Sequence, residues 1–376
     1  MSEKYTSILE FGAENTGAGN LSCAFEKAFA AGVLDLYLPR GMYRLDHTVL
    51  LPSHAHVLAD AEAIIFANPG GFRDYCMFRN ADAENGNEDI SLSGGVWDGR
   101  CDVNVRESYK DNDFVGLMFT FNNVKNLSMT NMRLRDGICY YIRLGEVRDF
   151  LLDNIRFEGT RTPGCQDGIH VGGGSENGRI RNIWAEPGSL GDDLVAFNAD
   201  DVFWYAHNWG MKALPIRHMT VENVQAEHCF TGVRLLSVEQ EISDIHFRNL
   251  RIGYRMHGIN LDAARHCADP IPELKNYPNG VGNMWDITFE NVELWYAGTG
   301  KGRECITFET NPKSMTFTNL SCPRVLEKNG VHPLFRFGFM GKTELNMDGE
   351  TVVLASGETM ETKQDGFGSV TVRNLD

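Results

Sequence analysis

A short motif recurs seven times along the chain: alternating apolar residues, then an asparagine, then another apolar residue. The spacings between successive asparagines are 23, 28, 41, 26, 42 and 28 residues, so a period in the twenties is interrupted by two long insertions. A repeat of this length matches one coil of a solenoid, in which each coil packs only on its neighbours. The asparagines are Asn131, Asn154, Asn182, Asn223, Asn249, Asn291 and Asn319.

Within each repeat the apolar residues alternate with polar ones, which is the period of a β-strand. In the segment from Met219 to Val224, every second side chain can point to the interior of a coil. The asparagines then fall at one corner of each coil, where we expect their side chains to bond to backbone groups of the next coil. The predicted fold class is therefore all-β, a parallel β-helix or solenoid.

One segment has a helical pattern: residues 20–32, with Asn20 or Ser22 as the N-cap and Gly32 as the stop. The end of a solenoid needs a cover, so we expect this helix to cap the N-terminal end. Because coils pack only on their neighbours, residues 1–376 fit a single domain. We assign about 1–60 to the cap and first coil, and about 330–376 to the last coils and a C-terminal cap.

Charge and cysteine content argue against several functional classes. The chain has 35 basic and 51 acidic residues, a formal net charge of −16, so nucleic acid and anionic membranes are not expected partners. Nine cysteines without a C-x-x-C pair indicate reduced, mostly buried thiols, and we expect neither a metal site nor a cofactor. The N-terminal residues lack the pattern of a secretory signal, and no long apolar run occurs, so a cytoplasmic location is expected.

Two segments place aspartates at equivalent positions of successive coils. Asp167 lies in CQDGIHVGG, and Asp192 and Asp193 lie in GDDLVAFNADD. Aligning the inward residues, Ile169 with Val195, sets Asp167 beside Asp193 at about the 4.8 Å spacing of paired strands. Carboxylates this close raise one another's pKa, which gives the protonated and ionised pair that glycoside hydrolysis needs. The alternatives are turn aspartates or a calcium site.

The same register defines a second column of residues on this face. Its members are Arg143, His170, Ala196, Arg234 and Asn260. Two arginines on one face can bind a substrate carboxylate, or they can neutralise the aspartates as structural ion pairs. His170 is a candidate to bind substrate or to tune an aspartate. His257, which follows Thr231 in the aspartate column, is a further candidate for substrate binding.

Long insertions leave the coils near 100–115, 198–217 and 263–284. Loops on one face of a rigid stack are common binding sites. The 198–217 loop is rich in aromatic residues, of which Trp204 and Trp209 are the main candidates to stack on a sugar ring. The alternative is that these rings pack the loop onto the coil wall.

Three motifs resemble the pectate-lyase-like right-handed β-helix superfamily: ILEFGAENTG, DLYLPRGMYRL and GGVWDGR, all within about the first hundred residues. The aspartate segments resemble glycoside hydrolase family 28, the polygalacturonase family, which carries Asn-Thr-Asp-Gly and then Gly-Asp-Asp. Asp167 keeps the Asp-Gly, and Gly191, Asp192 and Asp193 match the second motif. By this resemblance Asp192 is the general acid, Asp167 and Asp193 hold the attacking water, and the anomeric carbon is inverted.

The chain departs from the family pattern further on. The family's Gly-His-Gly is replaced by Phe230-Thr231-Gly232, although His228 lies nearby as a candidate substitute. The family also carries Arg-x-Lys, and in this register Asn260 stands at the position of its arginine. An arginine, Arg234, occurs one coil earlier, but Leu236 stands in place of the lysine. The resemblance therefore implies a β-helical glycosidase and leaves polygalacturonan open as the substrate.

Three functional hypotheses follow. The first is an inverting glycoside hydrolase acting on an acidic, plant-type oligosaccharide, with exo-action favoured by the expected intracellular location. The second is a polysaccharide lyase or uronate epimerase on the same fold, and the third is a non-catalytic carbohydrate-binding β-helix. An oligosaccharide is the expected partner in each case, and assembly into a homo-oligomer stays open.

Overall fold

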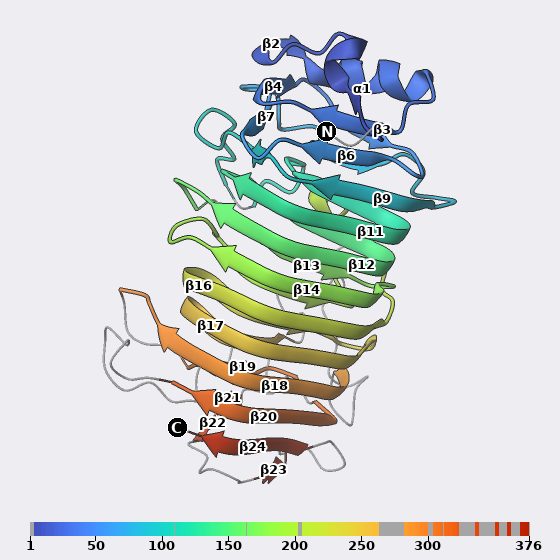
Figure 1. The fold of residues 1–376 in the computed structure, drawn as a ribbon. Coiled ribbons are helices and arrows are strands. Elements are labelled where there is room, and N and C mark those ends of the chain that lie inside the picture. Colours follow the sequence, from blue (N-terminus) through green and yellow to red (C-terminus); the bar gives the residue numbers. More distant parts are fainter. Residues whose placement is uncertain are drawn as a thin grey trace.

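A computed structural model describes residues 4–108, 110–162, 164–201, 205–262, 282–299, 304–310 and 312–322, and four strands nearer the C-terminus. Figure 1 shows a tall stack of strands in which successive coils lie on one another. The longest series of strands runs through the whole stack and pairs in parallel at every step. Its members are β1 Thr6–Ser7, β3 Asp35–Leu38, β6 His56–Ala59, β9 Asn87–Ser93, β11 Phe119–Arg135, β12 Ile142–Glu158, β14 Glu176–Ala185, β16 Ile216–Leu236, β17 Glu241–Asp262, β18 Asn283–Tyr296, β20 Ser314–Ser321 and β24 Ser369–Leu375.

A second parallel series carries the candidate site. It joins short strands to the first residues of β11 and β12 and to the last residues of β16 and β17. These short strands are β5 Val49–Leu51, β8 Phe78–Asn80, β13 Ile169–Gly172, β15 Asp193–Asn198, β19 Ile306–Phe308 and β21 Phe335–Phe337. The long strands therefore bend from one face of the coil to the next.

The remaining strands lie near the two ends of the stack. A third parallel series near the N-terminal end comprises β2 Thr16–Asn20, β4 Gly41–Leu45, β7 Ala63–Ala67 and β10 Val96–Asp98. Antiparallel pairs occur at the other end, where β22 Glu350–Val352 pairs with β21 and β23 Thr359–Glu361 pairs with β24. The all-β architecture expected from the repeat is therefore present.

The core consists of columns of apolar side chains that stack from coil to coil. In one column Phe247, Phe289 and Phe317 occupy equivalent register positions. The rings of Phe247 and Phe289 lie 4.4 Å apart at 2°, and those of Phe289 and Phe317 lie 4.9 Å apart at 11°. All three are buried, so the inward half of the predicted alternation is confirmed. Such columns give each coil its apolar contact with the next one.

The repeated asparagines lie at a corner of the coils, as expected, but their side chains bond differently. Asn131, Asn154 and their counterparts in later coils have φ between 53° and 57°, a left-handed conformation that asparagine tolerates. The Asn154 amide donates to Asn131 at 2.8 Å, and Asn319 donates to Asn291 at 2.7 Å. The expected bonds to backbone groups are therefore wrong for these pairs, whose bonds run from amide to amide. Asn182 donates instead to Asp153 Oδ1 at 2.8 Å.

The helix predicted at 20–32 is present as α1 Leu21–Ala30, with Asn20 as its N-cap. The Asn20 side chain accepts from the Ser22 backbone N–H at 3.0 Å. The apolar side chains of Leu21, Phe25 and their neighbours are buried, and Figure 1 places α1 at the N-terminal end of the stack. Among the described residues, no helix is long and apolar enough to cross a membrane.

Candidate active site

The strand register brings the sequence motifs together on one face. Ile169 pairs with Val195 and Val171 pairs with Phe197, as the alternation predicts. The backbone N–H of Gly168 donates to the Asp193 carbonyl oxygen at 2.8 Å, which sets Asp167 and Asp193 on adjacent coils. The aspartate column continues through Thr231 to His257, and the second column runs Arg143, His170, Ala196, Arg234, Asn260.

The carboxyl groups of Asp167, Asp192 and Asp193 form one cluster, with oxygens within 4.8 Å of one another. Asp167 is 3% exposed and Asp193 is 2% exposed, whereas Asp192 is half-buried. A glycine at position 168 allows the chain to approach β15 closely, because a Cβ there would lie 2.7 Å from the Leu194 carbonyl oxygen. The two aspartate motifs thus come together where the tight turn before β13 lies against the start of β15.

Burial and mutual repulsion raise the pKa of all three carboxyl groups. Burial is the largest cause in each case, raising the pKa of Asp167 to about 6 and those of Asp192 and Asp193 to about 7. The charge of Asp167 adds to the effect on Asp192, and the charge of Asp192 adds to the effect on Asp193. Near neutral pH the cluster therefore holds both protonated and ionised carboxyl groups.

His170 lies buried between two aspartates. Its Nδ1 atom is 2.7 Å from Asp167 Oδ2, and its Nε2 atom is 2.7 Å from Asp201 Oδ2. The Tyr140 ring stacks on the imidazole at 4.3 Å. Burial lowers the pKa of His170, but the charge of Asp201 and the hydrogen bonds with both aspartates outweigh it and raise the pKa to about 9. The ring is therefore an imidazolium at neutral pH.

Arg234 is the second cation at the cluster. Its Nη1 atom lies 3.4 Å from Asp193 Oδ2, and its Nε atom donates to Asp262 Oδ2 at 3.0 Å. Nη2 also bonds to Asp262. Arg234 thus pairs with the aspartates. This agrees with the alternative in which the arginines neutralise the aspartates as structural ion pairs. The two cations, His170 and Arg234, face five carboxyl groups, so the site keeps an excess of negative charge that favours protonation.

Arg143, for which substrate binding and structural ion pairing both stayed open, is buried and held by groups of the protein. The side chain is 0% exposed. Its Nε atom donates to Thr120 Oγ1 at 2.8 Å, and Nη1 donates to the His207 carbonyl oxygen at 2.9 Å. A further bond from Nη2 reaches the Trp209 carbonyl oxygen. The guanidinium group therefore fixes the loop after β15 against the sheet.

The described part of that loop contains η2 Ala206–Asn208 and Trp209. Trp209 is 50% exposed, and the Arg79 guanidinium lies over its ring, 5.1 Å from the centroid. Both side chains line a pocket of about 450 Å³, together with Tyr205 and Thr120. His207 is fully buried, so its ring packs the loop against the rest of the protein. This agrees with the alternative given for the aromatic residues of the loop, that they pack it onto the coil wall. Trp204 and the insertion at 263–281 lie outside the described residues.

The other candidate residues lie on β16 and β17. His257 Nδ1 is 2.9 Å from Thr307 Oγ1. Asn260 is 9% exposed, and its Oδ1 atom has no hydrogen-bond partner among the described residues. His228 lies on β16 and is half-buried. The structure therefore brings Asp167, Asp192, Asp193, His170 and Arg234 into one connected group.

The site also contains residues that the sequence reasoning missed. Asp201 and Asp262 bind the two cations, and Tyr140 stacks on His170. Arg79 pairs with Thr120, which pairs with Arg143, so it belongs to the second column. Extending that column toward the N-terminus by register alone would have found Arg79.

The aspartate cluster offers only oxygen ligands, a set that suits a hard cation such as calcium. Two protein cations already contact it, because His170 bonds to Asp167 and Arg234 lies against Asp193. Fixed positive charges beside a carboxylate cluster oppose binding of a metal cation. The arrangement is therefore better suited to holding and moving protons than to binding a metal.

Comparisons with known proteins support a carbohydrate-active relationship. No family model matches the chain. A polygalacturonase from Gossypium barbadense is 22% identical over 362 residues, covering 88% of this chain and 86% of the relative. A protein described as probable rhamnogalacturonase C from Aspergillus niger is 26% identical over 294 residues, covering 76% of this chain and 54% of the relative.

Solved structures with this fold have varied activities. A family 28 exopolygalacturonase from Yersinia enterocolitica has a TM-score of 0.56 at 14% identity, covering 98% of this chain and 77% of its own. A mannuronan C-5 epimerase A-module from Azotobacter vinelandii scores 0.62 at 13% identity, covering 89% and 79%. The Streptococcus pneumoniae adhesin PfbA also scores 0.62, at 16% identity, covering 89% and 88%. The resemblance to β-helix proteins and to polygalacturonases is therefore confirmed. Because proteins with one fold can catalyse different reactions, the reaction has to be argued from the residues of the site.

Proposed function

We propose that this protein is a glycoside hydrolase that cleaves an acidic, plant-type oligosaccharide through Asp167, Asp192 and Asp193. The observation that carries the proposal is the meeting of three carboxyl groups with raised pKa values, whose oxygens lie within 4.8 Å of one another. Glycosidases need one carboxyl group that gives a proton and another that accepts one. This cluster supplies both near neutral pH.

Asp192 is the proposed general acid. Its pKa of about 7 keeps a substantial protonated fraction at neutral pH, and it is the most exposed of the three carboxyl groups. Asp167 has the lowest pKa of the three, about 6, and His170 stabilises its ionised form through a hydrogen bond. Asp167 and Asp193 are therefore the proposed pair that holds and deprotonates the attacking water.

The reaction has a balanced proton path. The water oxygen bonds to the anomeric carbon as the bond from that carbon to the glycosidic oxygen breaks. The leaving oxygen takes the proton of Asp192, and a proton of the water passes to Asp167 or Asp193. His170 and Arg234 touch the aspartates and set their charge, so we assign them as positioning residues.

The stereochemical course is a separate part of the proposal. The resemblance to family 28 supports inversion, with water attacking directly. In most glycosidases, however, an inverting pair of carboxyl groups stands roughly 6.5–9.5 Å apart and a retaining pair roughly 5–5.5 Å apart. The nearest oxygens of the three carboxyl groups lie within 4.8 Å of one another, and the anomer of the first product decides between the two courses.

A pectic oligosaccharide is the proposed substrate class. The relatives named polygalacturonase and rhamnogalacturonase support it. The pocket at Arg79 and Trp209 adds a cation and a half-exposed aromatic ring on the same face, the pair of groups that suits an acidic sugar. We further propose that residues 1–376 form one right-handed β-helix domain, capped by α1, because parallel pairing continues from β1 to β24.

The proposal is tested by incubating the protein with oligogalacturonides and rhamnogalacturonan oligosaccharides and measuring new reducing ends. We expect release by the wild-type protein and a loss of about 10²–10⁴-fold for Asp192→Asn, the range for a general acid. A 4,5-unsaturated product, detected by its ultraviolet absorbance, would instead establish the lyase alternative. Binding without product in both proteins would establish the non-catalytic one.

A further inference from the structure

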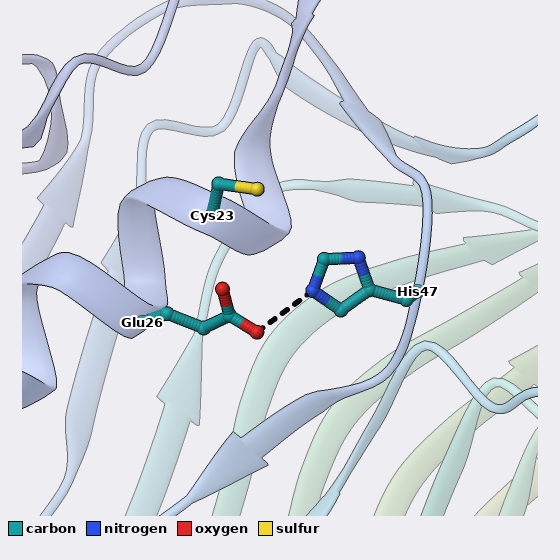
Figure 2. A group of neighbouring side chains, drawn as sticks. All are labelled: Cys23, Glu26 and His47. Atoms are coloured by element: carbon teal, nitrogen blue, oxygen red, sulfur yellow. Dashed lines mark hydrogen bonds and ion pairs between the residues drawn. The ribbon is translucent and has the colours of Figure 1, made fainter.

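A second cluster of chemically reactive side chains lies far from the aspartates, at the N-terminal end of the stack. A sulfur of Cys23, a carboxylate oxygen of Glu26 and a ring nitrogen of His47 lie within 4.8 Å of one another. Figure 2 shows Cys23 and Glu26 projecting from the helix toward His47, which comes from a separate segment. His47 belongs to the connection between β4 and β5, and its Nε2 atom is 2.8 Å from Glu26 Oε1.

We propose that Cys23, Glu26 and His47 bind a zinc ion that fastens α1 to the β4–β5 connection. This inference goes beyond the proposed function and does not depend on it. Cysteine sulfur, imidazole nitrogen and carboxylate oxygen are the ligand atoms that zinc takes in proteins. A thiolate and a carboxylate also balance the charge of a divalent cation. The sulfur distinguishes this cluster from the all-oxygen set of Asp167, Asp192 and Asp193.

Local structure holds the three ligands in place. Cys23 and Glu26 are three residues apart in α1, a spacing that puts both side chains on one face of a helix. Ser22 Oγ donates to the His47 carbonyl oxygen at 2.7 Å, which fixes the connection against the first turn of the helix. The N-cap residue Asn20 donates from Nδ2 to Cys23 Sγ at 3.2 Å, a supporting contact of the kind found around metal ligands.

The cluster also has room to close around an ion. The Glu26 side chain is 62% exposed and that of His47 is 42% exposed, so both can rotate by small amounts to reach zinc bond lengths of about 2.0–2.3 Å. Their exposure leaves the fourth tetrahedral position to water. Because the ion would join two segments that separate on unfolding, its binding energy adds to the stability of the folded chain.

The test uses the full chain after treatment with a chelator and titration with cobalt(II), a spectroscopic substitute for zinc. We expect a thiolate-to-cobalt charge-transfer band that saturates at one ion per chain and is removed by zinc. We also expect zinc to raise the melting temperature. Cys23→Ser abolishes the band, and His47→Gln weakens binding at least ten-fold. His54→Gln is the matched control, because His54 also contacts a carboxylate, Asp89 at 3.1 Å.

Each outcome decides the proposal. A band that is absent from the wild-type protein, or that survives in Cys23→Ser, overturns it. Circular dichroism of the metal-free variants checks their folding. If Cys23→Ser does not fold, Glu26→Gln provides the test, because this side chain is largely exposed and its replacement leaves the core intact. A zinc-dependent rise in melting temperature that is unchanged in Glu26→Gln also overturns the proposal.

Discussion

Nδ1 of His170 lies 2.7 Å from Oδ2 of Asp167, so the imidazole contacts a proposed catalytic carboxylate directly. The opposite ring nitrogen is held by Asp201, which fixes the ring and favours its charged form. An imidazolium lowers the pKa of a neighbouring carboxyl group. His170 therefore sets the proton distribution of the aspartate cluster without needing to touch the sugar.

Replacing His170 by Asn removes this charge and changes the pH profile. The pKa of Asp167 rises, so the acidic limb of the profile of kcat/KM against pH moves to higher pH. Because two buried aspartates lose their partner, we also expect a loss of about 3–5 kcal/mol in unfolding free energy near pH 7. The pH profile of His170→Asn is compared with that of His56→Asn, a half-buried control residue on β6 whose ring bonds to Ser91. An unshifted acidic limb contradicts the role of His170.

Stability should fall as pH rises from about 4 to about 9. The folded-state pKa values of the three aspartates exceed the ordinary value of 3.8, so the folded chain holds more protons than the unfolded chain between pH 4 and pH 7. The stability contributed by His170 is complete below its ordinary pKa of 6.5 and is lost as pH rises through about 9. Both effects have the same sign, whereas His207, whose pKa burial lowers to about 3, acts in the opposite direction below pH 6.5. Each unit of pKa difference corresponds to about 1.4 kcal/mol, so the three aspartates together outweigh His207.

Urea unfolding followed by tryptophan fluorescence at several pH values measures this decline. The variant Asp192→Asn, which lacks one carboxyl group with a raised pKa, flattens the curve between pH 4 and pH 7. The pKa of Glu241 is lowered, first by its hydrogen bond with Arg217, so Glu241 adds stability as pH rises through its ordinary value of 4.5 and acts only at the acidic end of this window. A stability that rises between pH 5 and pH 8 contradicts the assigned electrostatics.

Replacing Arg234 by Lys separates its charge from its geometry. Arg234 reaches Asp193 and Asp262 at once, which a lysine ammonium group cannot reproduce with the same planar geometry. We expect kcat to fall roughly ten- to hundred-fold, since the position of Asp193 is disturbed. Arg217→Lys is the matched control: Arg217 also lies on β16 and makes two bonds to one carboxylate, Glu241, on the outer surface. Equal effects of the two substitutions on kcat contradict the assignment.

Because aromatic rings of the core stack on one another, we expect truncation of one ring to lower the free energy of unfolding strongly. Phe289 lies between Phe247 and Phe317 and is 1% exposed. Phe289→Ala should lower the unfolding free energy by about 3–5 kcal/mol through lost burial and a cavity. Trp285→Ala, at a side chain that is 40% exposed on the same strand, should cost far less. Calorimetry of the two variants gives the comparison, and similar losses would show that the column does not carry the core.

Much of the fold could be predicted because a strand has a period of two and the coils repeat. The alternation around Ile169 and Val195 gave the correct register, and register alone placed Asp167 beside Asp193. The partner of each ladder asparagine was not predictable in the same way. At corners with the same left-handed backbone, Asn154 donates to the amide of Asn131, whereas Asn182 donates to the carboxylate of Asp153.

The rest of the site depends on contacts between distant segments. Arg143 is buried because the loop containing His207 and Trp209 folds back over it, 64 and 66 residues later in the chain. Asp201 lies beyond the end of β15, where alternation no longer indicates the direction of a side chain. Asp262 was missed for a related reason, because it is the last residue of β17, next to an insertion whose path no local pattern defines.

The central claim is hydrolysis by the aspartate cluster, and ¹H NMR of the first minutes of reaction tests it most directly. Wild-type protein and Asp192→Asn are mixed in turn with an acidic plant oligosaccharide, and anomeric signals are followed before mutarotation. We expect a new anomeric signal of inverted configuration in the wild-type reaction and none in the variant. A retained anomer would correct the stereochemistry alone. A vinyl proton of an unsaturated uronate, or an undiminished rate in Asp192→Asn, would contradict the account.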